Sequence, residues 1–238
     1  MVLPVEQQDV VMELLGRVTR GGHVFETWGF GDKVGRGLGT SVLMSGPPGT
    51  GKTMMAGLIA KELGRDLYQV DLSRIVSKYI GETEKQLATL FDAAESGHAI
   101  LLFDEADSLF GKRTEIKSSN DRYANLATNY LLQRLEQFSG IAILTTNHER
   151  AIDPALQRRL AFHLRIPMPD AAEREMIWRA LIPAAAECDA NLNFARLATT
   201  FQMSGGYIKN AVLRAAFLAS VEGLAISNEH LLRAARLE

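Results

Sequence analysis

The sequence predicts an α/β fold in which a doubly wound, five-stranded parallel sheet with a phosphate loop precedes a small all-helical region. Two observations support this prediction. Short apolar runs alternate with segments of helical periodicity in the first two thirds of the chain, which is typical of a parallel sheet with helices on both faces. Beyond Pro167 the apolar runs stop and only helical patterns continue. We therefore expect two domains, residues 1–167 and residues 168–238.

Five apolar runs have the length of buried strands. Parallel strands that are covered on both faces are expected as nearly continuous apolar runs, without polar alternation. Segments with helical periodicity separate the runs, at residues 54–63, 82–95 and 123–138. The expected strands are 41–45, 67–72, 99–103, 141–145 and 162–166.

Helical patterns also occur in the sequence before the first predicted strand and after the last one. Apolar residues recur at helical spacing over residues 10–18, and the glycine-rich stretch from Trp28 to Gly39 then predicts a loop before the first strand. Helical patterns follow the sheet at residues 171–184, 194–200, 206–221 and 228–237.

Composition excludes several classes of protein. The 238 residues are 47% hydrophobic and 23% charged, which is enough apolar material for folded cores. A formal net charge of -2 gives no strongly basic field of the kind that binds nucleic acid without sequence preference. Cys188, the single cysteine, excludes an intramolecular disulfide and favours a reducing, cytoplasmic location. No apolar run has membrane-spanning length, so we expect no membrane partner. The chain starts shortly before its first motif and stops straight after a helical pattern, as a piece of a longer protein would.

A glycine-rich motif directly follows the first predicted strand and directly precedes a helix. The motif occupies residues 46–53 and fits the pattern G-x-x-x-x-G-K-[ST]. Its glycines let backbone N–H groups turn inward around a phosphate, and the helix N-terminus adds partial positive charge. We expect Lys52 to reach the β- and γ-phosphates and Thr53 to offer its hydroxyl to Mg²⁺. The expected nucleotide-binding residues are Gly46, Pro47, Pro48, Gly49, Thr50, Gly51, Lys52, Thr53 and Met54.

Two acidic residues end the third predicted strand. Asp104 and Glu105 follow an apolar run, and therefore lie at the carboxyl edge where ligands of α/β sheets bind. Phosphoryl transfer depends on positioning and on charge stabilisation, so the two carboxylates should have different roles. We expect Asp104 to hold Mg²⁺ through water and Glu105 to orient the attacking water. Together with the phosphate motif, this pair predicts hydrolysis of ATP with Mg²⁺ as the metal.

The motifs GPPGTGKT, LLFDEAD, ILTTN and IDPALQRRL, in this order and spacing, resemble the AAA+ ATPase superfamily. The likeness extends from about residue 10 to the end of the chain, and the segment SKYIGETEK resembles the AAA clade of protein unfoldases and remodellers. This resemblance implies a ring-shaped homo-oligomer, a hexamer in the clade, and makes the helical region a lid. The run from FGKR through NDRYAN to NYLLQRLE also resembles bacterial ATPases associated with phage-tail-like contractile injection systems.

The same resemblance implies roles for further residues at the nucleotide site. Asn147 matches the polar residue called sensor 1, which helps to place the lytic water. Arg158 matches the arginine finger that reaches the γ-phosphate of the next subunit, with Arg159 as the reserve candidate. The clade usually has a second arginine three positions beyond the first, where this sequence has Ala161, so the choice between the two arginines stays open. Lys209 is the candidate for sensor 2 in the lid, and an exposed helix residue is its alternative.

A short aromatic segment bears on the substrate. Lys78, Tyr79 and Ile80, followed by glycine, match the pore loop that grips a polypeptide in the central channel of the ring. An aromatic side chain suits this task because it offers a large apolar contact to any sequence. The resemblance therefore implies a protein substrate. A tyrosine packed on its own helix is the alternative for Tyr79. For the whole chain, a DNA-acting member of the superfamily or a nucleotide-gated scaffold with little turnover stays open.

Overall fold

The computed structural model describes residues 3–34, 39–71, 82–106, 129–149, 152 and 154–238. Contacts within the chain divide it into two compact units. The first, here called the sheet unit, comprises Pro4–Gly46 and Lys52–Arg165, and the second, the helical unit, contains Pro47–Gly51 and Ile166–Glu238. The predicted division into domains at residue 167 stays a prediction.

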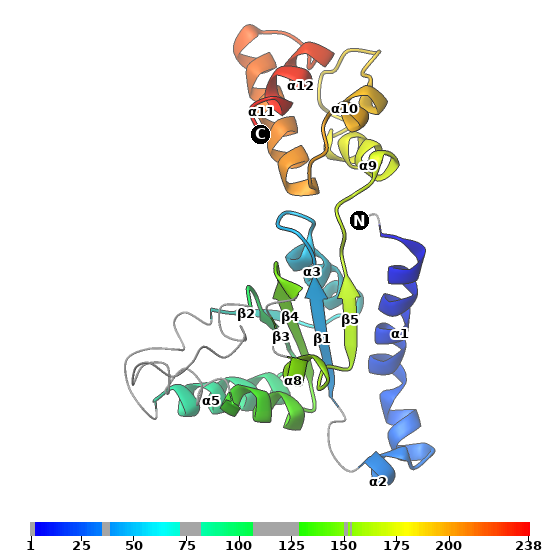
Figure 1. Cartoon of the computed structure of the whole chain (residues 1–238), viewed down its shortest axis with the longest axis vertical. Coiled ribbons are helices and arrows are strands. Elements are labelled where there is room, and N and C mark those ends of the chain that lie inside the picture. The colour runs from blue at the N-terminus through cyan, green and yellow to red at the C-terminus, as the bar shows by residue number, and fades with distance from the viewer. Residues whose placement is uncertain (1–2, 35–38, 72–81, 107–128, 150–151, 153) are drawn as a thin grey trace. The chain divides into compact units, whose positions relative to one another are not determined.

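The sheet unit is built on a five-stranded sheet in which every neighbouring pair of strands is parallel. The strand order is β2-β3-β4-β1-β5, so β4 lies between β1 and β3 (Figure 1). The predicted α/β class with a parallel five-stranded sheet is therefore confirmed. The strands are β1 (Thr40–Ser45), β2 (Leu67–Val70), β3 (Ile100–Phe103), β4 (Ile141–Thr146) and β5 (Phe162–Arg165).

Burial explains why these runs are apolar. All residues of β3 and β4 are buried, as expected for strands covered on both faces. The edge strand β5 instead alternates between buried and exposed residues. Helix α1 (Val5–Gly22) lies beside β5, and the Gln7 Oε1 atom accepts a hydrogen bond from the Arg165 N–H at 2.8 Å. This bond satisfies a donor that an uncovered sheet edge would leave to solvent or to another chain.

Helices pack on the sheet around an aromatic core. The Phe91 ring lies 6.0 Å from the Phe103 ring and 5.1 Å from the Phe138 ring, between centroids. All three side chains are buried. Besides α1, the helices of this unit include α3 (Lys52–Glu62), α5 (Glu82–Ser96), residues 129–137 and α8 (Pro154–Gln157).

The predicted loop between Trp28 and Gly39 is wrong at its beginning. A π-helical turn η1 (His23–Thr27) continues directly from α1, and a short helix α2 (Phe30–Val34) follows it. Gly29, with a φ of 72°, makes the turn between them. A Cβ atom on Gly31 would lie 3.0 Å from the Phe25 carbonyl oxygen, so glycine allows this close packing. Glycine here serves the packing of two helical segments, which the sequence pattern alone did not indicate.

The helical unit has a core of its own around Trp178, whose side chain is fully buried. Its first helix begins with a capping box between Asp170 and Glu173. That helix ends at Leu181, earlier than predicted, because Pro183 disfavours a helical conformation of the residue before it. The four helices are α9 (Ala171–Leu181), α10 (Phe194–Thr200), α11 (Gly205–Glu222) and α12 (Asn228–Ala235). Among the described residues, no helix combines the length and the apolar character that crossing a membrane requires.

Candidate functional site

The phosphate motif forms the turn between β1 and α3. Gly46, Gly49 and Gly51 have φ angles of 153°, 74° and 100°, a region that side chains disfavour and glycine adopts freely. The Thr50 hydroxyl closes part of the turn by donating to the Pro47 carbonyl at 2.9 Å. Helix α3 starts at Lys52, so its first N–H groups have no partners within the helix. A turn of this kind before a helix N-terminus suits an anionic phosphate.

Lys52 links the carboxyl ends of two neighbouring strands. Its side chain is buried, and its Nζ atom donates to the Gly46 carbonyl at 2.8 Å and to Asn147 Oδ1 at 2.7 Å. Lysine has no acceptor, so the oxygen of the Asn147 amide must face it, and the amide Nδ2 keeps its hydrogens for another partner. Asn147 directly follows β4. The structure therefore brings these two predicted site residues together.

The Asp104 carboxylate accepts hydrogen bonds from side chains of three different elements, α3, β2 and β4. The Thr53 hydroxyl and the Gln69 amide Nε2 each lie 3.1 Å from its Oδ2 atom, and the Thr145 hydroxyl donates to its Oδ1 atom. A carboxylate beside a threonine hydroxyl offers the oxygen ligands that Mg²⁺ prefers. Thr53 and Asp104 therefore fit the predicted metal site, and the phosphate turn directly precedes Lys52 and Thr53 in the chain.

Glu105 has an unusual backbone. Its φ is 53°, in the left-handed region that residues with a Cβ atom adopt only rarely. Its N–H donates to the Thr145 hydroxyl at 3.1 Å, and its side chain is exposed. Strained backbone of this kind is often found where a side chain must point in one direction for function.

The two candidates for the arginine finger lie at the amino ends of the strands, opposite the phosphate turn. Arg158 and Arg159 follow α8 and precede β5, whose first residue, Phe162, pairs with Val42 near the start of β1. Figure 1 shows α8 near the tails of the strand arrows, at the end of the sheet away from their tips. With six residues in β1 and a rise of about 3.3 Å per residue, the two edges lie roughly 15–20 Å apart.

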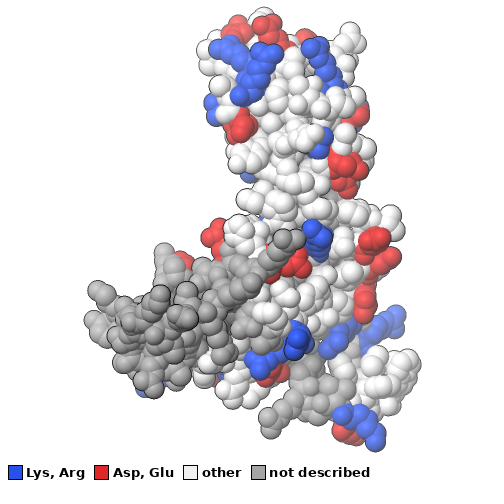
Figure 2. All heavy atoms as spheres, viewed as in Figure 1, with Lys and Arg blue, Asp and Glu red and all other residues white. Residues whose placement is uncertain are grey.

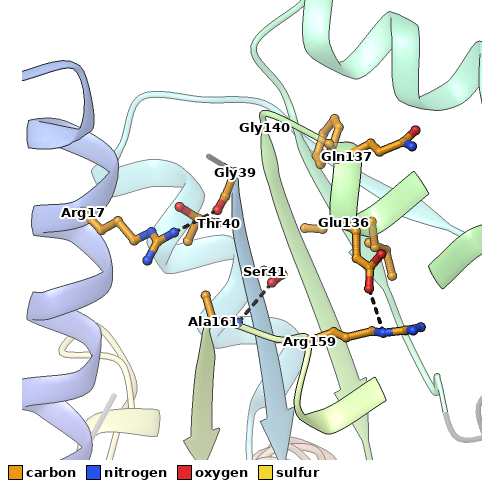
Figure 3. Close-up of a pocket in the computed structure, with 12 residues that line it drawn as sticks. Arg17, Gly39, Thr40, Ser41, Glu136, Gln137, Gly140, Arg159 and Ala161 are labelled. Carbon is orange, nitrogen blue, oxygen red and sulfur yellow. Dashed lines mark hydrogen bonds and ion pairs between the residues drawn. The ribbon is translucent and has the colours of Figure 1, made fainter. Parts of the chain in front are cut away.

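The two arginine side chains differ in their surroundings. Arg159 Nε lies 2.7 Å from Glu136 Oε1 of the same chain (Figure 3). Both residues line a cavity of about 330 Å³ at the amino ends of the strands, together with Arg17, Thr40 and others. Arg158 is exposed to solvent. The structure therefore gives different surroundings to Arg158, the first candidate from the sequence, and Arg159, the reserve candidate.

The other predicted residues lie on helices or outside the described residues. Met54 is exposed in the first turn of α3, and Lys209 is exposed on α11 in the helical unit. The predicted pore residues Lys78, Tyr79 and Ile80 lie outside the described residues. Their roles stay predictions.

Three residues at these places were missed by sequence reasoning. Gln69 and Thr145 bond to the acidic pair, and Glu136 pairs with Arg159. The signal for Gln69 and Thr145 was a polar residue inside a run expected to be a buried strand. A helical glutamate such as Glu136 carries no signal of this kind.

Comparison with known proteins adds independent findings. The family model described as "ATPase family associated with various cellular activities (AAA)" matches residues 42–168. The chain is 34% identical over 201 residues to "ATP-dependent zinc metalloprotease FtsH 3" of Sphaerobacter thermophilus, covering 80% of this chain and 40% of that protein. It is 32% identical over 190 residues to the "Proteasome-activating nucleotidase" of Saccharolobus islandicus, covering 76% of this chain and 48% of that protein.

A third relative is "Fidgetin-like protein 1" of Xenopus laevis, with 34% identity over 148 residues, 60% of this chain and 22% of that protein. The chain thus spans less than half the length of each of these relatives.

Proposed function

Because the chain belongs to the ATPase family associated with various cellular activities, we propose that its copies form a ring, a hexamer, that couples ATP hydrolysis to the remodelling or threading of proteins. Members of this family hydrolyse ATP with Mg²⁺, so the chain is an ATP phosphohydrolase with these cofactors. Two relatives have names that refer to protein breakdown, a metalloprotease and a proteasome-activating nucleotidase. Their names favour a protein as the substrate. A cytoplasmic location belongs to the same proposal, and the narrower likeness to injection-system ATPases stays a prediction.

The observation that carries the ring is the position of Arg158. It lies at the amino edge of the sheet, whereas the phosphate turn follows the carboxyl end of β1. An arginine side chain is far shorter than the roughly 15–20 Å between these edges, which is the length of a six-residue strand. If Arg158 stabilises charge on a phosphate, that phosphate must therefore be bound to another copy of the chain. The Glu136 carboxylate already holds Arg159, which favours Arg158 as the finger.

The proposed mechanism assigns one task to each side chain at the carboxyl edge. Lys52 offsets the charge of the β- and γ-phosphates, and the Asn147 Nδ2 hydrogens help to place the attacking water. The Glu105 carboxylate orients and polarises that water. Thr53 and Asp104 would hold Mg²⁺, which neutralises charge on the phosphate oxygens as it develops. Arg158 of a neighbouring copy completes the site.

Mixing two inactive variants tests the shared site. Arg158→Ala and Glu105→Gln subunits should each be inactive alone, yet mixed rings should recover part of the ATP turnover. Recovery is expected because some interfaces then join an intact Glu105 to an intact Arg158. The measurement is the rate of phosphate release, with ring mixing checked by native mass spectrometry.

Arg159→Ala is the matched comparison for this mixing experiment. Rings that are shown to be mixed but do not recover with Arg158→Ala would contradict its assignment as the finger. If ATP turnover recovers in rings that contain Arg159→Ala in place of Arg158→Ala, Arg159 is the finger instead. Full activity of a single isolated chain would contradict the shared site altogether.

Changing the predicted pore residue tests the substrate. Tyr79→Ala should leave ATP turnover within a few-fold of the parent, because the segment has no predicted contact with phosphate. Unfolding of a folded protein substrate should be lost. An aromatic contact of this kind contributes about 1 kcal/mol, and a ring would present one Tyr79 side chain from each subunit. The measurement is ATP turnover beside the loss of fluorescence of a tagged, folded reporter protein, with the full-length protein.

Tyr68→Ala is the control for that variant, because Tyr68 is an exposed tyrosine on β2 outside the predicted pore segment. If Tyr79→Ala unfolds the reporter as well as the parent does, the pore assignment is wrong. The same assays, repeated with DNA added, separate the two alternatives. A DNA-acting enzyme would show turnover stimulated by DNA and would not unfold the reporter. A scaffold would assemble with ATP while hydrolysing little of it.

Figure 2 shows acidic and basic side chains on the visible face of each unit, so this face gives neither unit a purely basic surface.

A further inference from the structure

Thr145 contacts two successive residues of the proposed site with a single hydroxyl group. Its oxygen donates a hydrogen bond to Asp104 Oδ1 and accepts one from the Glu105 N–H at 3.1 Å. The Thr145 carbonyl accepts a further bond from the Ala106 N–H at 2.8 Å. These contacts continue the pairing of β3 with β4, which ends at Phe103 and Leu144. One residue of β4 thus bonds to each of the three described residues that follow β3.

The chemistry of this position narrows the choice of side chain. A hydroxyl has one hydrogen to donate and lone pairs with which to accept, so it can serve the Asp104 carboxylate and the Glu105 N–H together. Valine has the same shape and neither function. Thr145 is 1% exposed, so water has little access to replace the hydroxyl. Loss of the hydroxyl would leave a carboxylate oxygen and an N–H group each short of a partner.

The turn needs this support because Glu105 is strained. Its φ of 53° is unfavourable for a residue with a Cβ atom, and backbone in this region persists where surrounding contacts hold it. The bond from its N–H to Thr145 is such a contact. Relaxation of the turn would redirect the Glu105 side chain, which is exposed to solvent.

We propose that Thr145 is a positioning residue for ATP hydrolysis, whose hydroxyl keeps the metal-binding Asp104 and the water-orienting Glu105 in one fixed relation. This inference rests on the roles proposed above for Asp104 and Glu105. It differs from a purely structural role, in which a buried threonine would only contribute to stability. A positioning role predicts a loss in turnover that exceeds the loss in stability or in nucleotide binding.

The test compares three variants of the full chain. Thr145→Val removes the hydroxyl and keeps the shape, Thr145→Ser keeps the hydroxyl, and Thr40→Val removes a hydroxyl from another buried threonine, at the amino end of β1. For each variant, kcat and KM for ATP, the Mg²⁺ concentration for half-maximal turnover and the melting temperature are measured.

For Thr145→Val we expect kcat to fall roughly 10–100-fold, the range seen when partners of metal-site ligands are removed. Half-maximal turnover should need more Mg²⁺, and KM for ATP should change little because no predicted phosphate contact is lost. Thr145→Ser should retain most of the parental kcat, and Thr40→Val should match the parent in kcat. The melting temperatures of the two valine variants should be similar.

Several results would overturn the proposal. They are parental turnover in Thr145→Val, an equal loss in Thr145→Ser, or an equal loss in Thr40→Val. If Thr145→Val does not fold, Thr145→Ser and Thr145→Ala carry the same comparison, because serine and alanine differ by the hydroxyl alone. Glu105→Gln separates this inference from its premise. Parental turnover in Glu105→Gln would overturn both, whereas an inactive Glu105→Gln beside an active Thr145→Val would overturn the Thr145 inference alone.

Discussion

Glu105→Gln is expected to bind ATP and Mg²⁺ as the parent does while its turnover falls on the order of 100-fold or more, the range typical of an acid–base group. The amide keeps the shape of the side chain and loses the charge that orients water. The backbone turn should survive, because the bond to Thr145 comes from the Glu105 N–H and not from its side chain. Single-turnover hydrolysis and the binding of a fluorescent ATP analogue measure the two effects separately.

Glu62→Gln is a suitable control, since Glu62 is an exposed carboxylate at the end of α3. It should hydrolyse ATP at the parental rate. Parental turnover in Glu105→Gln would show that another residue orients the water. A parallel loss of nucleotide binding would show that Glu105 contributes to binding. It would then be wrong to assign Glu105 to catalysis alone and binding to Lys52 and Thr53.

Lys52→Ala is expected to lose nucleotide affinity itself. A charge-assisted hydrogen bond contributes about 1.5–3 kcal/mol, which corresponds to roughly 10–100-fold weaker binding. The loss should appear in the bound state as well as in turnover, because the ammonium group contacts phosphates before any bond breaks. Equilibrium titration with a fluorescent ATP analogue, in the presence of Mg²⁺, measures it.

The interpretation of Lys52→Ala needs a check on folding. The buried Lys52 side chain also connects Gly46 to Asn147, so its loss could loosen the ends of β1 and β4. The melting temperature without nucleotide reports this effect. Lys61→Ala removes an exposed lysine from the same helix and should bind the analogue like the parent. Parental affinity of a folded Lys52→Ala variant would contradict the phosphate contact.

The strands of the sheet were predictable because parallel strands buried on both faces need continuous apolar runs. β3 is the clearest example, as its four residues are all buried and all apolar. Helix ends were less predictable, because they depend on capping and on proline. The segment from Phe30 to Val34 was mispredicted as loop, because its Gly31, which allows close packing of helical segments, was interpreted as a loop residue.

Some parts of the candidate site could likewise be predicted from the sequence, and others could not. The phosphate turn is encoded in consecutive residues, and its glycines, lysine and threonine need only the strand before and the helix after to take their places. The sequence by itself therefore determined the class of fold and the phosphate motif, and with them the reaction that we expected. It also determined that Asp104 and Glu105 directly follow a strand.

Only the tertiary structure decided which distant residues meet. The order β2-β3-β4-β1-β5 brings the ends of β1, β3 and β4 to one edge, so that Lys52 reaches Asn147 and Thr145 holds Asp104. The pairing of Arg159 with Glu136, which favours Arg158 as the finger, likewise joins residues far apart in the chain. Such contacts depend on strand order and register, which arise from the packing of the whole sheet. The sequence shows Thr145 as a polar residue in an apolar run, but not which residues it contacts.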